Sequence, residues 1–405
     1  MTSAAPDDLI YFTPDVTDAV TIKRVQEFLD HGCRLLVIGF RRERVNRGYA
    51  PAWPHVLLGQ TRDGRYGQRL LALLRAIPAL FAQRKRYEGA RIFYARNIDQ
   101  LLLALLARLL IAGRPEIVYE VLDIPPILIG RGPASIGLRW LERLCLRRVR
   151  MLVLSSPGFH KHYFAGVQRH NGPWFLLENK LHPSIRQSRP AAPDAQAANR
   201  RRRLSGRWVV AYCGLIRGQE TIDLIARLAE RLGDRVSFRF HGVLTTVDEA
   251  AFHQTVARLT NVTYEGEYSA HRDLQAIYAD VDFAWALDLE HVDHNSRWLL
   301  PCRFYEAGFL GVPCLAVHGF EVGEMIERLD AGWTFDRPLE DSLVRFFERL
   351  TPAAYEEMRE KLLALPPGRF VAGEDVAVLC EKLGLGQRDD EAPPAVTPVL
   401  DRARG

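Results

Sequence analysis

The sequence predicts an α/β protein with two doubly wound domains, each built on a parallel sheet. Two series of alternating strand and helix signals run along the chain, one before and one after a stretch rich in proline and arginine. The predicted strands are almost continuously apolar, which indicates burial on both faces of a sheet. The length of 405 residues is too great for one ordinary core and fits two domains.

The first series opens with a strand at 9–12, a loop at 13–18 and an amphipathic helix that ends before His31-Gly32. Apolar runs predict the later strands, and helical spacing predicts two helices between them. The strands are expected at 34–40, 91–95, 117–122, 151–154 and 174–177, and the helices at 99–111 and 137–148.

The second series opens with a strand at 208–213, a glycine loop and a helix at 221–232 that Gly233 ends. Further strands are expected at 236–241, 261–264, 281–285 and 314–317. Ligands of doubly wound folds bind outside the carboxyl ends of the strands. Two such domains that face each other would therefore hold their ligands in a cleft between them.

Four segments follow from this pattern. They are an N-terminal Rossmann-like domain at 1–182, a linker at 183–206, a C-terminal Rossmann-like domain at 207–385 and a disordered tail at 386–405. The linker contains the run Arg200–Arg203, which is either a solvated loop or a contact for a polyanion.

The charge is divided unevenly along the chain. Residues 1–180 carry 27 Lys/Arg against 15 Asp/Glu, whereas residues 208–405 carry 20 against 33. A basic first half points to a polyanionic partner for that half. A basic amphipathic helix at 69–81 would suit anionic lipid headgroups, which predicts a peripheral protein of the cytoplasmic membrane face. The basic patches lack interleaved aromatic residues, so we expect no nucleic-acid partner.

Cysteine spacing and hydropathy predict a reduced, cytoplasmic protein. The six cysteines form no C-x-x-C pair, which argues against a disulfide framework or a zinc site. The N-terminus lacks the features of a signal peptide, and the longest apolar run, at 101–112, is too short to cross a bilayer.

The segment from Asn295 to Val317 is the most informative for function. It predicts a short helix that begins beside Pro301 and ends before Gly311, followed at once by a buried strand. Arg303 and Glu306 lie three apart, so they share a face near the positive end of that helix. A helix start with an arginine suits a phosphate, and a carboxylate one turn on suits the hydroxyls of a ribose. The pattern indicates a nucleotide-sugar site.

A second glycine-rich turn supports this interpretation. Gly214 and Gly218 lie between a strand and a helix, where glycine lets the backbone approach a pyrophosphate. Arg217, between them, would neutralise the charge of a departing diphosphate. The alternative is an ordinary tight turn with a surface arginine.

Four motifs stand out in the second half: GLIRG at 214–218, NVTYEGEY at 261–268, ADVDFA at 279–284 and LPCRFYEAGFLGVPCLA at 300–316. They resemble the donor half of GT-B glycosyltransferases, and in particular the ExoL-type enzymes of exopolysaccharide biosynthesis, which are related to glycosyltransferase family 4. Weaker matches in the first half are PDVTD at 14–18, GFRR at 39–42, ARNID at 95–99, YEVLDI at 119–124 and LENK at 177–180. Together they cover roughly residues 9–380.

The resemblance implies that Glu306 holds the donor ribose and that Arg217 and Arg303 contact the diphosphate. It also implies that the loop and helix start at 319–324, with Gly323 and Glu324, lie near the donor sugar. The wider family has a glutamate eight positions before the ribose ligand, where this chain has Trp298. The sugar contact would then fall to His294, Asn295 or Arg297.

The first half is expected to bind the acceptor. Asp15, Glu120 and Asp123 lie near strand ends and are the candidate catalytic carboxylates. The acceptor ligands are expected to be Asp18, Arg96 and Asn97, although Asp18 is also a good cap for the helix that follows it.

The sequence thus predicts a hexosyltransferase that moves a sugar from a nucleotide diphosphate donor, UDP-linked, to a saccharide that is growing or linked to a polyprenyl diphosphate. It needs no cofactor, and cations replace a metal ion, since Asp280-Val281-Asp282 fits a buried strand start better than a metal motif. The family would imply retention of the anomeric configuration. The alternatives are a nucleotide-sugar 2-epimerase of the same fold and a non-catalytic polyanion-binding protein.

Overall fold

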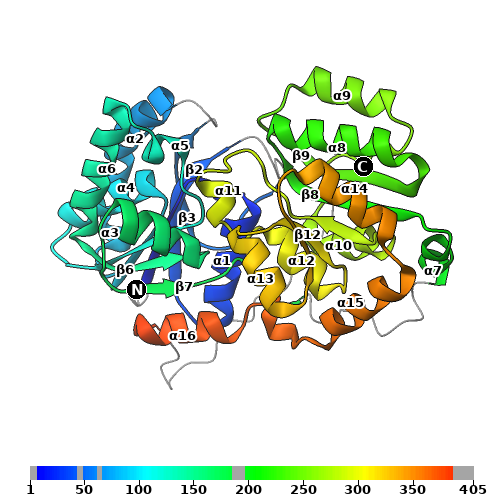
Figure 1. Cartoon of the computed structure of the whole chain (residues 1–405). Helices are drawn as coiled ribbons and strands as arrows, with labels where there is room; N and C mark the ends of the chain where they lie inside the picture. The colour runs from blue at the N-terminus through cyan, green and yellow to red at the C-terminus, as the bar shows by residue number, and fades with distance from the viewer. Residues whose placement is uncertain (1–6, 43–48, 62–65, 185–196, 386–405) are drawn as a thin grey trace, which may run out of the picture. The chain divides into compact units, whose positions relative to one another are not determined.

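The computed structural model describes residues 7–42, 49–61, 66–184 and 197–385 (Figure 1). They form two sheets with parallel pairing, one of seven strands and one of six. The predicted α/β class with two parallel sheets is therefore confirmed. The predicted tail at 386–405 and the first part of the predicted linker, at 185–196, lie outside the described residues.

The first sheet has the strand order β3-β2-β1-β4-β5-β6-β7. Its strands are β1 Leu9–Thr13, β2 Leu35–Arg41, β3 His55–Gln60, β4 Ile92–Arg96, β5 Glu116–Val121, β6 Val149–Leu154 and β7 Trp174–Leu176. All except β3 were predicted. Strand β3 lies at the sheet edge, follows two prolines and exposes alternate side chains, so it lacks the apolar run that marks the others.

The helices of this half are α1 Ala19–Asp30, α2 Tyr66–Ala82, α3 Arg84–Tyr87, α4 Ile98–Leu109, α5 Pro126–Ile129, α6 Pro133–Leu146 and the π-helix η1 Phe159–Val167. Helix α1 starts where the sequence predicts, because the Asp18 carboxylate accepts a hydrogen bond from Thr21 N at 2.6 Å. Helix α2 contains the predicted amphipathic segment, and its Leu71, Leu74 and Phe81 are exposed.

The second sheet has the order β10-β9-β8-β11-β12-β13. Its strands are β8 Trp208–Ile216, β9 Val236–Leu244, β10 Val262–Tyr264, β11 Phe283–Trp285, β12 Cys314–Val317 and β13 Gly332–Phe335. Only β13 was not predicted. It is four residues long and three of its residues are half-buried, so the sequence carries little periodicity there.

Short loops and helices connect these strands, and three further helices follow the last of them. The helices are α8 Gln219–Leu232, α9 Glu249–Arg258, α10 Ala270–Ala279, α11 Asn295–Trp298, α12 Cys302–Phe309, α13 Glu321–Leu329, α14 Leu339–Arg349, α15 Pro352–Ala364 and α16 Glu374–Lys382, with 3-10 turns at Gly233–Arg235 and Pro367–Arg369. Helix α8 packs on β9 with α14 beside it (Figure 1). Phe283 on β11 lies at the centre of an aromatic cluster with Trp208, Trp333 and Tyr355.

By compactness, the chain divides into one unit of residues 1–95, 102–116 and 376–405 and another of residues 96–101 and 117–375. The second unit contains the whole six-stranded sheet together with β5, β6 and β7. The domain boundaries predicted at 182 and 207 remain predictions. Within the described residues, no helix is long and apolar enough to cross a membrane.

The arginine run does not form a solvated loop, which corrects one of the two interpretations of it. It lies in helix α7, Ala197–Leu204. Arg203 is 2% exposed and pairs with Asp282 at 3.0 Å, and Arg202 pairs with the same carboxylate at 2.9 Å. Arg203 also lies over the ring of Tyr355 at 4.7 Å. Asp282 thus anchors α7 to the second sheet, which explains why an aspartate occupies this buried position before β11.

Candidate functional site

The predicted glycine loop lies at the end of β8, which continues to Ile216, three residues beyond its predicted end. Gly214 has φ +110° and Gly218 has φ +79°, a region that only glycine adopts without strain. A Cβ on Gly218 would lie 3.0–3.1 Å from Glu290 atoms. Gly242 on β9 packs still closer, since a Cβ there would lie 1.8 Å from the Gly214 carbonyl oxygen. Glycine at these positions leaves the backbone at the end of β8 without covering side chains and lets neighbouring backbone segments pack closely against it.

Helix α12 carries Arg303 and Glu306 as predicted, although Pro301 is the residue before the helix rather than its first residue. Gly311 after the helix has φ +71°, which confirms its predicted left-handed conformation. Arg303 Nη1 donates to the Trp285 carbonyl at 3.1 Å, and its guanidinium lies 4.1 Å from the Tyr212 ring centre. The Arg303 Nη2 atom is the nearest neighbour of a Cβ built on Gly214, at 3.9 Å. Two segments far apart in the sequence therefore meet here.

Arg303 stays charged although it is only 8% exposed. Burial works against the cation, but Tyr212 and Asp288 outweigh it and hold the pKa of Arg303 above its usual value. Glu306, one turn further along α12, is also 8% exposed. The pKa of Tyr268 is raised well above its usual value, mainly by burial and secondly by the charge of Glu306. Tyr268 follows β10, so a third segment comes close to the same carboxylate.

Arg217 is held by acidic side chains that follow β11. Its Nε donates to Asp288 Oδ2 at 2.9 Å, its Nη2 contacts the same oxygen, and Glu290 lies 3.4 Å from Nε. Burial opposes the charge of Arg217, whereas Asp288 and Asp123 stabilise it, so its pKa is raised. Asp288 also accepts a hydrogen bond from Ser296 Oγ at 2.8 Å. Burial would raise the pKa of Asp288, but Arg217 and Arg303 lower it overall.

Asp123 follows β5, and its side chain is exposed although protein groups surround its carboxylate. Its Oδ1 accepts a hydrogen bond from Asn295 Nδ2 at 3.1 Å, and Ile124 N donates to Asn295 Oδ1 at 2.9 Å. Desolvation raises the pKa of Asp123, while Arg217 and the Asn295 amide act in the opposite direction. The structure therefore brings together Asp123 and two residues that were predicted to bind the donor, Asn295 and Arg217.

Trp298, at the position of the family's first glutamate, has structural contacts. Its carbonyl accepts a hydrogen bond from Ser156 Oγ, and its ring stacks on His162 at 5.5 Å between centres. Among the three replacements named from the sequence, Asn295 is buried against Asp123, His294 stacks on His291 at 4.9 Å and Arg297 is exposed.

Three other predicted residues lie around the start of α4. Glu120 is fully buried in β5, and its carbonyl accepts a hydrogen bond from Asn97 N at 3.0 Å. Asn97 has φ +71°, an uncommon conformation for a residue other than glycine. Arg96, at the end of β4, is 5% exposed and contributes to the charge around Asp123. Their predicted catalytic and acceptor roles remain predictions.

Asp15 lies in the other compact unit and organises its own loop. Its carboxylate accepts hydrogen bonds from Thr17 N at 3.0 Å, Thr17 Oγ1 at 2.8 Å and Arg42 N at 3.4 Å. Burial nevertheless raises its pKa. These contacts give Asp15 a structural role, and its predicted catalytic role is untested.

The predicted donor segment at 319–324 begins helix α13. A Cβ on Gly323 would lie 2.3 Å from the Val317 carbonyl oxygen, so glycine is needed for the helix to pack on β12. Glu324 is exposed in the first turn of the helix.

Asp288, Ser296 and Tyr268 were not predicted as site residues from the sequence. Asp288 offered a signal, since it is an acidic residue just after a buried strand, the same type of position as Asp123. Its partner Arg217 lies 71 positions away, and that distance hides the pair from local patterns.

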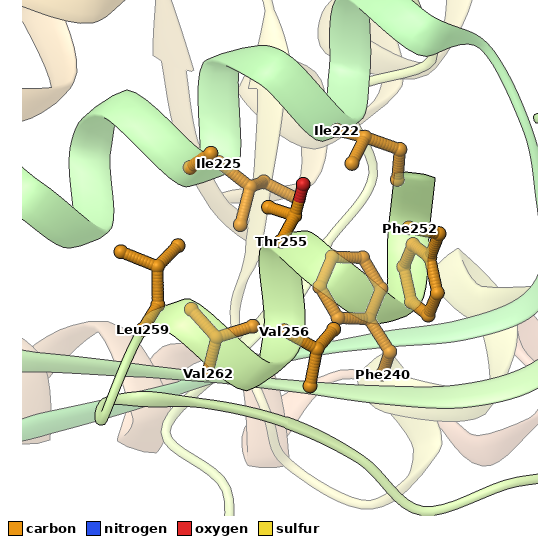
Figure 2. Close-up of a pocket in the computed structure, with 9 residues that line it drawn as sticks. Ile222, Ile225, Phe240, Phe252, Thr255, Val256, Leu259 and Val262 are labelled. Carbon is orange, nitrogen blue, oxygen red and sulfur yellow. The ribbon is translucent and has the colours of Figure 1, made fainter. Parts of the chain in front are cut away.

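A hydrophobic recess beside the six-stranded sheet does not belong to this site. It lies under α9 and is lined by apolar side chains such as Ile225, Phe240, Phe252 and Val262 (Figure 2). It has no room for a water molecule. We interpret it as a small packing defect between helices α8 and α9 and strands β9 and β10.

Comparison with known proteins places this geometry in a fold class. No protein-family model matches the chain. The structure superposes on Anabaena HepE, solved in complex with UDP and glucose, with a TM-score of 0.66 and 15% identity over 93% of this chain and 99% of that one. It also superposes on a sucrose-phosphate synthase from Thermosynechococcus elongatus, with a TM-score of 0.67 and 14% identity over 93% and 98% of the two chains. The protein has the GT-B fold of glycosyltransferases, as the sequence resemblance implied.

The chain is also similar in sequence to the succinoglycan biosynthesis protein ExoL of Rhizobium meliloti. The two are 28% identical over 368 residues, which are 90% of this chain and 89% of ExoL. The predicted resemblance to ExoL-type proteins is therefore confirmed, and the protein is ExoL-like.

Proposed function

We propose that this protein is a glycosyltransferase of exopolysaccharide biosynthesis that transfers a hexose from a UDP-linked donor to a growing or lipid-linked saccharide. The observation that carries the proposal is the meeting of Gly214 with Arg303, one turn before Glu306. These residues were selected from the sequence as donor ligands. The similarity to ExoL, and the UDP complex of HepE, support the pathway and the nucleotide.

In this proposal each donor residue has a separate task. Asp288 holds the Nε and Nη2 edge of Arg217, which leaves the Nη1 donors for a phosphate oxygen. Arg303 Nη2 is directed at the bare backbone of Gly214, where a diphosphate would approach. Both cations would stabilise the charge that develops on the departing diphosphate, without need of a metal ion. The Glu306 carboxylate would accept hydrogen bonds from the ribose hydroxyls.

Gly323 and Glu324 at the start of α13 complete the proposed donor site. Asp123 is the best placed of the catalytic candidates, because its side chain is exposed and Arg217 acts on its carboxylate. A raised pKa suits a group that exchanges a proton with an acceptor hydroxyl near neutral pH. Retention of the anomeric configuration is part of the proposal and rests on the resemblance to family 4.

The polyanion-binding alternative loses its main support in the structure. Arg202 and Arg203 belong to a structural ion-pair network with Asp282, so half of the arginine run is already engaged.

The direct test is a panel of UDP- and GDP-linked hexoses, each assayed for binding, hydrolysis and transfer to lipid-linked saccharides. We expect UDP-sugars to bind and to turn over. Conversion of a donor to its 2-epimer without transfer would indicate the epimerase, and no binding or turnover with any donor would exclude the proposed activity.

A further inference from the structure

Helix α6 presents an apolar face to the surface instead of a polar one. Ile136, Trp140 and Leu144 are spaced four residues apart, so they line one face, and they are 56%, 62% and 44% exposed. The opposite side of the helix buries Glu142, which accepts hydrogen bonds from Tyr119 and Tyr163. The usual arrangement of a surface helix, apolar towards the core and charged outwards, is thus partly inverted.

The exposed charges on the chain before, within and after this helix are all of one sign. Residues 125–161 contain seven basic residues and a single acidic residue, Glu142, which is fully buried. The basic residues are Arg131, Arg139, Arg143, Arg147, Arg148, Arg150 and Lys161. Six of them, Arg131, Arg143, Arg147, Arg148, Arg150 and Lys161, are exposed, and Arg147 and Arg148 directly follow the helix. A large indole flanked by exposed cations is the composition of a helix that lies in a membrane interface.

A second copy of this chain is a poor candidate to cover the face. Three large side chains on a single helix bury far less than the roughly 800 Å² per partner of a standard interface. In a twofold dimer the same arginines would also face each other, and like charges across an interface are unfavourable. An anionic bilayer removes both difficulties, because it accepts a narrow apolar face and neutralises the cations around it.

We propose that α6, with the arginines that flank it, docks this protein on an anionic lipid surface. Ile136, Trp140 and Leu144 enter the headgroup boundary, and Arg147 and Arg148 contact lipid phosphates. This inference goes beyond the glycosyltransferase assignment and does not depend on the donor chemistry. It also differs from the helix predicted for this purpose from the sequence, α2, which lies in the other compact unit.

The test is co-sedimentation of the full chain with vesicles of phosphatidylcholine alone or mixed with phosphatidylglycerol, at low and high salt. We expect binding only to the mixed vesicles, and less of it at high salt. The Arg147→Ser/Arg148→Ser variant should weaken binding roughly twentyfold or more, since each arginine near the surface contributes about 1 kcal/mol, or about fivefold. Trp140→Ser should weaken binding at both salt concentrations.

Matched controls come from helix α7, in the same compact unit. Leu204 is 67% exposed and Arg201 is exposed, so Leu204→Ser and Arg201→Ser remove similar groups from another surface. These variants should bind as the wild type does, and all variants should keep the wild-type thermal unfolding and donor turnover. Undiminished binding of the α6 variants would overturn the proposal, and α2 would then be the surface to test. Failure of the wild type to bind mixed vesicles, or concentration-dependent dimerisation that Trp140→Ser abolishes, would also overturn it.

Discussion

The side-chain amide of Asn295 is fixed by Asp123 and by the backbone next to it. Its Nδ2 donates to the Asp123 carboxylate at 3.1 Å, and its Oδ1 accepts the Ile124 N–H at 2.9 Å. The backbone donor determines the orientation of the amide, so its NH₂ group must face the carboxylate. One side chain therefore connects the loop after β5 to the start of α11, although the two lie 172 positions apart in the chain.

Asn295→Ala should therefore change the pH dependence of transfer. The amide hydrogen bond lowers the pKa of Asp123 against the effect of burial, so its loss should raise that pKa further. If Asp123 acts as a base, activity requires its deprotonated form and falls as the pH drops through its pKa. The acid limb of the kcat/KM profile should then move to higher pH. An unshifted profile would argue against Asp123 as the titrating group.

The same substitution should also lower stability. It leaves the buried Ile124 N–H without its acceptor, which costs about 1–3 kcal/mol. Asp293→Asn, at an exposed carboxylate two positions away, is the control and should change neither the pH profile nor the unfolding temperature.

Glu306→Gln should weaken nucleotide binding while the fold is kept. The substitution preserves the shape of the side chain but removes the charge that would strengthen hydrogen bonds to the ribose hydroxyls. Loss of such charged hydrogen bonds costs about 1.5–3 kcal/mol, so the Kd for UDP should rise about 10- to 100-fold in calorimetric titration. Glu327→Gln, at an exposed carboxylate on α13, should bind UDP as the wild type does.

A deoxynucleotide makes this test specific for the ribose. If Glu306 holds the sugar, 2′-deoxy-UDP should bind the wild type more weakly than UDP, and this penalty should be smaller in Glu306→Gln. An equal penalty for the deoxynucleotide in both proteins would mean that Glu306 acts elsewhere.

Much of the donor half could be predicted because its signals are local. The proline before α12, the left-handed Gly311 after it and the apolar run of β12 lie within one short segment. Gly214 and Gly218 were recognisable for the same reason, since a strand, a glycine turn and a helix follow each other directly. Strands β3 and β13 were missed because half-buried edge positions carry no continuous apolar run.

The features that escaped prediction depend on contacts between distant residues. The composition at 197–204 gives helix α7 no apolar stripe, and the helix is anchored by Asp282, about 80 positions away. Asp288 was overlooked because its role is to hold the Arg217 guanidinium in place, and Arg217 is distant in the sequence. Electrostatic pairs of this kind leave no periodicity in a single sequence.

Asp282→Asn should destabilise the second unit strongly. Its carboxylate is fully buried and accepts hydrogen bonds from Arg202, Arg203 and Val209 N. Removal of one partner of a buried ion pair leaves the other charge uncompensated, which costs about 3–5 kcal/mol. Asp280→Asn is the matched control, since that carboxylate is 53% exposed and also pairs with Arg202, and it should cost less than about 1 kcal/mol. Urea denaturation measures both, and equal effects would show that Asp282 does not anchor α7.

Gly242→Ala should damage the donor site from a neighbouring strand. Its new Cβ would lie 1.8 Å from the Gly214 carbonyl oxygen, so the backbone of the proposed diphosphate loop would have to move.

Gly266 is the matched control. Its backbone oxygen accepts the Gly242 N–H at 2.7 Å, and it also has a positive φ of +81°. A Cβ on Gly266, however, would meet nothing within 4 Å. Gly266→Ala should therefore cost only the left-handed conformation, about 1–2 kcal/mol, and leave UDP affinity unchanged. Gly242→Ala should cost more in thermal unfolding and also reduce UDP affinity, because its clash falls on the loop next to Arg303. If the two variants bind UDP equally well, the Gly214 loop does not contact the nucleotide.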